Sequence, residues 1–121
     1  MDIVVSRQHG QWLHELALLF DLVWATTWGA TANTTFGGFY GLPALPNVEL
    51  IDLPRGGTRK LAAVASYVGD RSTAWIDDEL YEDAEAWAQA RTPPTLLLRT
   101  APYVGLRAEN VDALKRFAKS I

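Results

Sequence analysis

The feature that most constrains this chain is an apolar run of strand length that ends abruptly in two adjacent carboxylates. The run covers residues 73–76 and is followed directly by Asp77 and Asp78. Because Asp is a poor strand residue, we expect the strand to stop at Asp77. Open α/β sheets place their ligands at the carboxyl ends of parallel strands, so the position indicates a ligand site. Neighbouring carboxylates repel each other unless a cation compensates, which indicates Mg²⁺, a hard ion that prefers oxygen ligands.

A second interpretation of these acids needs no ligand. Asp77, Asp78 and Glu79 would lie at the start of the next helix, where carboxylates cap free N–H groups and balance the helix dipole. The stretch alone favours this capping interpretation, whereas the rest of the chain favours a ligand site.

Length and composition limit the classes of protein to which the chain can belong. With 121 residues, 49% of them hydrophobic, we expect a single domain over residues 1–121. A formal net charge of -3 argues against a nucleic-acid partner, and the lack of cysteine excludes disulfides and thiolate chemistry. The first residues do not resemble a signal peptide, and no apolar run approaches the ~20 residues of a membrane span. A cytoplasmic protein without a membrane partner is therefore predicted.

Apolar runs and their spacing predict alternating strands and helices. Strands are predicted at residues 3–5, 22–28, 48–53, 73–76 and 95–98. Helices are predicted near Gly10, at residues 30–33, from 58 or 59 onward, after Leu80 and at 109–121. This alternation is typical of parallel strands joined by right-handed crossovers. The predicted fold is an α/β three-layer sandwich with a Rossmann-like, mainly parallel sheet.

Several of the predicted helices, including the following two, show a clear apolar face. In the helix that starts near residue 58, the buried positions are expected to be Leu61, Val64, Ala65 and Val68. In the helix at 109–121, the inward positions are expected to be Val111, Leu114, Phe117, Ala118 and Ile121.

Lys60 falls in the first turn of its predicted helix, where a cation opposes the helix dipole at a cost of ~0.3–1 kcal/mol. It is either a solvated lysine at low local cost or a residue with a binding role. The direction of the elements favours a role, because a strand's carboxyl end and the next helix's amino end share one edge of a parallel sheet. We expect that edge to gather Thr26, Thr27, Lys60, Asp77 and Asp78. A hydroxyl and an ammonium suit phosphate oxygens, and the acids suit Mg²⁺.

At these residues the chain resembles the haloacid dehalogenase-like (HAD) superfamily, and more narrowly its small, Trp-rich members of actinobacterial type. The second motif of that superfamily is an apolar strand ending in Thr or Ser, matched by residues 22–28 with Thr26 as first choice and Thr27 next. Its third motif is a lysine, matched by Lys60, and its fourth is an apolar strand ending in paired acids, matched by Asp77 and Asp78. The resemblance implies that the hydroxyls and the lysine serve catalysis and that the two acids hold the metal.

The chain departs from the superfamily at the first motif. HAD phosphatases begin with an apolar strand followed by Asp-x-Asp, which supplies the nucleophile and the general acid. These 121 residues contain no such motif: Asp2 precedes the first predicted strand, and Ser6 and Arg7 follow it. Without the nucleophile, the route through an aspartyl-phosphate is closed. The resemblance then implies a HAD-like domain with remnants of a phosphate and Mg²⁺ site, with Mg²⁺ binding weak or absent, and inactive as a phosphatase on its own.

Two alternatives stay open. An active Mg²⁺-dependent HAD phosphohydrolase would take its nucleophile from an upstream segment or a partner chain. A generic α/β domain would use its acids only to cap a helix. The central strand position is filled by residues 3–5, by an upstream segment or by another chain, and a missing first strand would expose backbone groups that recruit other strands. The predicted partners are a phosphorylated small molecule and a homo-oligomer or partner chain.

Overall fold

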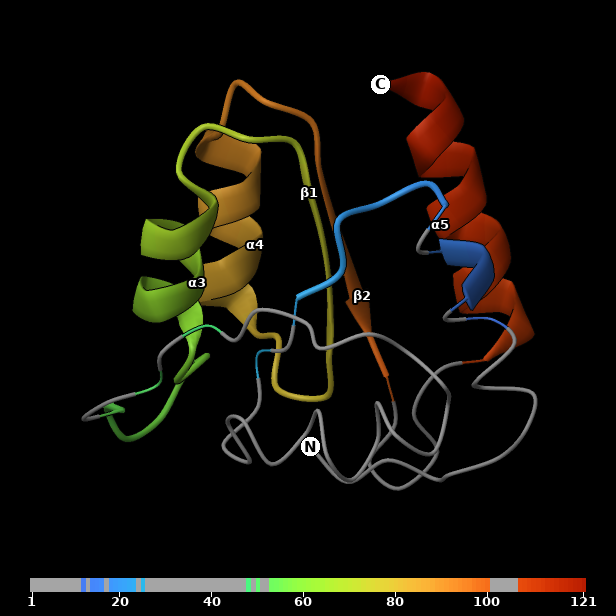
Figure 1. Cartoon of the computed structure of the whole chain (residues 1–121). Coiled ribbons are helices and arrows are strands. Elements are labelled where there is room, and N and C mark those ends of the chain that lie inside the picture. The colour runs from blue at the N-terminus through green and yellow to red at the C-terminus, as the bar shows by residue number, and fades with distance from the viewer. Residues whose placement is uncertain are drawn as a thin grey trace.

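The computed structural model describes residues 12, 14–16, 18–23, 25, 48, 50, 53–100 and 107–121. Within them the order of the labelled elements is α3 (Leu61–Val68), β1 (Thr73–Asp77), α4 (Glu82–Ala90), β2 (Thr95–Arg99) and α5 (Ala108–Ser120). Figure 1 shows α3 and α4 on one side of the two strands and α5 on the other. The described part of the chain is a mixed α/β fold.

The two strands form a parallel pair, as the βαβ spacing of the sequence predicts. Their register runs from Thr73 opposite Thr95 to Asp77 opposite Arg99. Two further hydrogen bonds extend the ladder: Thr73 N donates to Pro94 O at 3.0 Å, and Thr100 N donates to Asp77 O at 3.1 Å. Because α4 connects two parallel strands, both strands end at the same edge. Asp77 therefore lies at the carboxyl edge of the sheet.

The predicted helices near residues 61, 82 and 109 are all present, with small differences at their ends. Lys60 is the N-cap of α3 and not part of its first turn, and Gly69 ends the helix with a φ of 56°. A positive φ of this size suits glycine, which has no Cβ to clash. Ile121 was predicted to face inward, and this is wrong: it follows the last residue of α5 and is 54% exposed.

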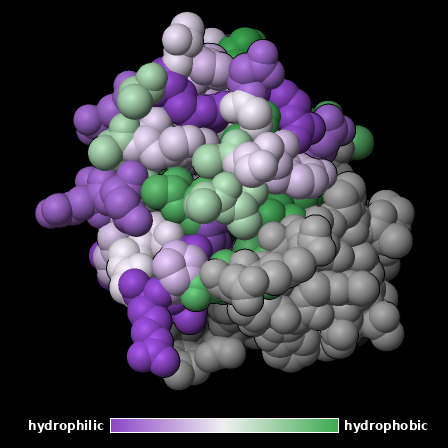
Figure 2. Space-filling view, turned by 90° about the vertical axis from the view of Figure 1, so that its left-hand side faces the viewer, coloured by the Kyte–Doolittle hydropathy of each residue, from purple (hydrophilic) through white to green (hydrophobic). Residues whose placement is uncertain are grey.

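The main core lies between β1 and the helices α3 and α4. Its buried residues are Val48, Val64, Trp75, Leu80 and Ala84. Trp75 of β1 meets Trp87 of α4 edge to face, with ring centroids 6.2 Å apart. Figure 2 shows the face that carries α3 and α4, with polar residues over much of it and apolar ones gathered near its middle.

A second contact joins described residues near the N-terminus to α5. Leu16 is buried, and the rings of Phe20 and Phe117 stack with centroids 6.5 Å apart. Lys115 pairs with Glu15 at 3.2 Å. Segments about a hundred residues apart in sequence thus lie side by side on the α5 side of the strands (Figure 1).

Part of the predicted strand at 22–28 lies within the described residues. Leu22, Val23 and Ala25 belong to the predicted strand at 22–28, yet none of them is in a strand. Val23 and Ala25 pack against the core, so they contribute apolar contact without a hydrogen-bonded ladder. Residues 3–5, 26–28 and 30–33 lie outside the described residues. In the described part of the chain, no helix is long and apolar enough to cross a membrane.

Candidate functional site

The most unusual polar contact in the described part of the chain is a buried ion pair at the carboxyl edge of β1. Lys60 Nζ lies 2.8 Å from Asp77 Oδ2, and the two side chains are only 5% and 2% exposed. Lys60 is set at the start of α3 and Asp77 at the end of β1, 17 residues later. Because α3 runs into β1 through a short turn, the amino end of the helix and the carboxyl end of the strand meet here. The structure thus brings together two of the predicted site residues.

The surroundings of Asp77 favour its ionised form. Burial acts to raise the pKa of Asp77, but the Lys60 charge and hydrogen bonds with Lys60, Asp78 and the backbone of Glu79 lower it further than burial raises it. The net pKa of Asp77 is below its ordinary value. The Glu79 bond runs from the backbone N–H to Oδ1 at 3.1 Å. Both carboxylate oxygens of Asp77 are therefore engaged by protein donors.

The adjacent acid behaves in the opposite way. Burial, together with the hydrogen bond and negative charge of Asp77, raises the pKa of Asp78 above its ordinary value. Asp77 holds the charge next to Lys60, while Asp78 holds a proton to higher pH than a free aspartate. Two neighbouring carboxyls with separated pKa values can act at one site as an acceptor and as a donor.

The acids at 77–79 do not cap the following helix. That helix, α4, starts at Glu82, and its N-cap residue Tyr81 makes no side-chain capping bond. The acids in its first turn are Glu82, Asp83 and Glu85. The capping interpretation of Asp77 and Asp78 is therefore wrong, since they lie four and three residues before the N-cap residue Tyr81.

Three consecutive residues ahead of α3 each bond to a carboxylate in the stretch that runs from the last residue of β1 to the first turn of α4. Lys60 binds Asp77; Arg59 makes two bonds to Glu79, each of 3.1 Å. Thr58 bonds to Asp83 through both its backbone N–H and its hydroxyl. The sequence predicted that Lys60 and Asp77 share this edge, although not as an ion pair, and the Arg59 and Thr58 contacts were not predicted. The signal for them was the long acidic stretch after β1, which offered several possible partners for any nearby donor.

Thr100 is a further residue at this edge that sequence reasoning missed. It follows β2 directly, is 6% exposed, and its hydroxyl has no hydrogen-bond partner within the described residues. Its backbone N–H donates to Asp77 O, which places it beside Asp77. The signal that finds it is the one used for residues 22–28, an apolar strand followed by a threonine.

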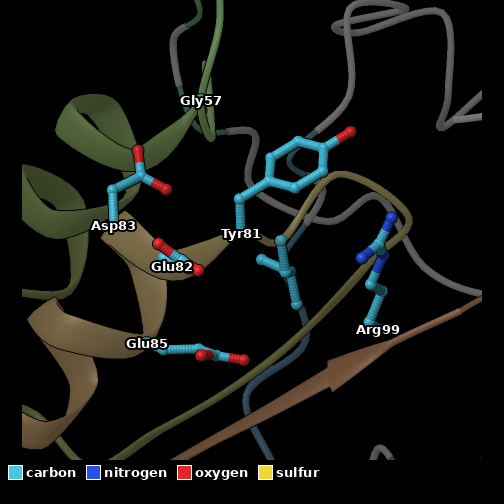
Figure 3. Close-up of a pocket in the computed structure, with 7 residues that line it drawn as sticks. Gly57, Tyr81, Glu82, Asp83, Glu85 and Arg99 are labelled. Atoms are coloured by element: carbon cyan, nitrogen blue, oxygen red, sulfur yellow. The ribbon is translucent and has the colours of Figure 1, made fainter.

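A pocket of about 660 Å³ opens between the start of α4 and the end of β2. Figure 3 shows Tyr81, Glu82, Glu85 and Arg99 around it. The Arg99 guanidinium lies over the Tyr81 ring, 5.0 Å from its centroid. Because Arg99 is opposite Asp77 in the strand register, this pocket adjoins the edge that carries the ion pair.

The described residues fit a full magnesium site poorly. They contain no group of three or more His, Cys, Asp or Glu side chains that could hold a metal ion. Asp77 and Asp78 are two carboxylates, and Lys60 already neutralises the first. The predicted hydroxyls, Thr26 and Thr27, lie outside the described residues, so the edge is defined by Lys60, Asp77, Asp78 and Thr100. Comparison of the chain with protein families, with curated proteins and with solved structures found no match.

The opposite pKa shifts of the two acids predict opposite responses to removal of their charges. The pKa of Asp78 is higher in the folded protein than its unfolded value of about 3.9. The stability that protonated Asp78 gives is therefore fully present below about pH 3.9 and is lost as pH rises through the folded pKa. At pH 7 the charge of Asp78 therefore destabilises the fold. We expect Asp78→Asn to stabilise the protein by up to about 1 kcal/mol at pH 7, and not at pH 3. Urea unfolding at both pH values measures this, and a loss of stability at pH 7 would contradict it.

Proposed function

We propose that the chain is a HAD-like domain that binds a phosphorylated small molecule at the edge formed by Lys60, Asp77 and Asp78, without hydrolysing it alone. The proposal includes the fold predicted from the sequence, a three-layer α/β sandwich on a Rossmann-like, mainly parallel sheet. The observation that carries it is the buried Lys60–Asp77 pair. The pattern of strand-end hydroxyls, lysine and paired acids supports the same assignment.

A buried ion pair is a costly feature that stability alone explains poorly. Removing two charges from water costs several kcal/mol per ion, and well-packed apolar residues at such positions often give equal or greater stability. A pair of this kind is well explained by a ligand that needs a charge fixed in place. The carboxyl edge of parallel strands is where open α/β sheets bind their ligands.

The ion pair leaves donors for an anion. An ammonium has three N–H donors, and the contacts among described residues assign one of them to Asp77. The remaining donors of Lys60 and the hydroxyl of Thr100 suit phosphate oxygens. Asp78, whose pKa is raised, uses its single O–H toward Asp77 when it is protonated, so the donors for phosphate are those of Lys60 and Thr100. Asp77 fixes the position of the lysine.

Magnesium would bind weakly at this edge. Asp77 and Asp78 would be its ligands, and a bound Mg²⁺ would neutralise phosphate charge. To bind the metal, Asp77 would have to share oxygens that already accept bonds from Lys60 and from the Glu79 backbone. No further acidic ligand among the described residues completes the coordination of the metal, so Mg²⁺ binding is expected to be weak or absent.

The proposal predicts that this chain alone does not hydrolyse phosphate monoesters. Positioning and charge neutralisation accelerate phosphoryl transfer only when a nucleophile is placed in line. Asp77 is buried and paired, and the sequence contains no Asp-x-Asp. With Mg²⁺ and an aryl phosphate, we expect wild type and Asp77→Asn both to release phosphate at the rate of buffer alone. Turnover by wild type that Asp77→Asn abolishes would instead indicate an active phosphohydrolase.

A further inference from the structure

Asp83 is the acceptor for both polar donors of a residue 25 positions earlier. Its carboxylate receives the Thr58 backbone N–H at 3.0 and 3.2 Å and the Thr58 hydroxyl at 2.7 Å. These bonds, with those from its own helix, lower the pKa of Asp83 below its ordinary value. Figure 3 shows Asp83 extending from α4 toward the loop that contains Gly57. An acid on α4 therefore anchors the loop that leads into α3.

The loop is shaped to admit this carboxylate. A Cβ added to Gly57 would lie 2.9 Å from Asp83 Oδ2, closer than real Cβ contacts come. Gly57 also has a φ of 60°, a backbone conformation that favours glycine. Any side chain at position 57 would thus strain the backbone and displace Asp83.

Thr58 connects Asp83 to the start of α3. It is 3% exposed, and its hydroxyl accepts the Tyr81 backbone N–H at 2.8 Å while donating to Asp83. Its carbonyl accepts the N–H of Leu61, the first residue of α3, at 3.1 Å. Lys60 lies between Thr58 and Leu61, so the hydrogen bond between these two residues fixes the backbone on both sides of Lys60. Without Asp83, the buried N–H of Thr58 would lack its acceptor, which is the costly way to lose a hydrogen bond.

We propose that Asp83 is a positioning residue that holds Lys60 against Asp77 by fixing Thr58 at the start of α3. The effect of Asp83 on phosphate binding rests on the proposed function, whereas its effect on the position of Lys60 does not. The lysine stem has four rotatable bonds, so a buried ammonium stays at one carboxylate only if its backbone is held. Arg59 and Glu79, which are partly exposed, give the same connection weaker support.

The position of Lys60 can be read without any ligand. The sequence has three lysines, and the other two, Lys115 and Lys119, lie on α5 and are not buried. A buried, ion-paired ammonium exchanges its protons slowly, so a ¹H–¹⁵N spectrum of lysine side chains should show the Lys60 signal alone. The second readout is the affinity for inorganic phosphate.

The variants are Asp83→Ala, the milder Asp83→Asn, Thr58→Val and the double variant Thr58→Val/Asp83→Ala. Glu82→Gln is the matched control, because Glu82 is in the same turn and forms no hydrogen bond or ion pair with the described residues. We expect Asp83→Ala and Thr58→Val each to remove the Lys60 signal and to weaken phosphate binding by about tenfold. The double variant should be no worse than either single one, as for residues acting through one contact. Glu82→Gln should change neither readout.

The outcomes separate the two proposals. Loss of the Lys60 signal in Asp83→Asn or a folded Asp83→Ala supports the positioning role even if wild type binds no phosphate, in which case only the proposed function fails. If Asp83→Ala does not fold, Asp83→Asn decides. A Lys60 signal that persists unchanged in the folded Asp83 variants would overturn the positioning role, as would additive effects of Thr58→Val and Asp83→Ala.

Discussion

Replacing Lys60 with Met should destabilise the fold by about 3–5 kcal/mol, and Asp77→Leu alone should have a similar cost. Each single change leaves one charge of a pair that is 5% and 2% exposed without its partner. The double variant Lys60→Met/Asp77→Leu should recover most of the loss, because it buries no charge. Urea unfolding of the four proteins gives the coupling energy directly.

The neighbouring pair supplies the control for this cycle. Arg59 and Glu79 also pair at 3.1 Å, but their side chains are 43% and 33% exposed. Breaking a pair with that much solvent access is expected to cost less than about 1 kcal/mol. If Lys60→Met costs no more than Arg59→Met, the burial of the Lys60–Asp77 pair has no energetic consequence in solution, and the basis of the site is lost.

Trp75→Ala should have the second large effect, lowering the free energy of unfolding by about 3–5 kcal/mol. Trp75 is 6% exposed, and the change would leave a cavity between β1 and α4 and remove the contact with Trp87. Trp75→Phe should cost about 1 kcal/mol, because the indole N–H has no acceptor within the described residues and its loss breaks no bond. Thermal unfolding of both variants measures the difference.

Trp87→Ala serves as the comparison for Trp75→Ala. Trp87 is only partly buried, with the Arg91 guanidinium 4.8 Å from its ring centroid. The loss should therefore be smaller than that for Trp75→Ala. Equal losses would show that the Trp75–Trp87 contact itself, and not the burial of Trp75, determines the stability.

Sequence reasoning predicted the elements that border the site because each carries a local signal. The apolar run before Asp77, the helical spacing of Val64 and the break at Gly69 fix α3 and β1 to within a few residues. The meeting of Lys60 with Asp77 followed from direction alone, since a helix that leads into a strand must begin at the edge where that strand ends.

The rest depended on contacts that leave no local signal. The run of acids after β1 does not reveal that Thr58 bonds to Asp83, 25 residues away. The helical period placed Ile121 inward, but the helix ends one residue before it. Apolar residues at 22, 23 and 25 indicated a strand, whereas in the structure these residues lie outside any strand, since apolar packing does not itself require a ladder. Thr26 and Thr27 lie outside the described residues and stay predictions.

The most direct test of the central claim is to measure by calorimetry at pH 7 how tightly inorganic phosphate binds to wild type and to Lys60→Met/Asp77→Leu. The double variant is expected to keep the fold, which the unfolding cycle above tests, and it removes the charges of Lys60 and Asp77 while leaving Asp78 in place. We predict saturable binding to wild type that is weakened at least about tenfold in the double variant. Equal binding to both proteins, or no binding to wild type, would contradict a phosphate site at Lys60 and Asp77.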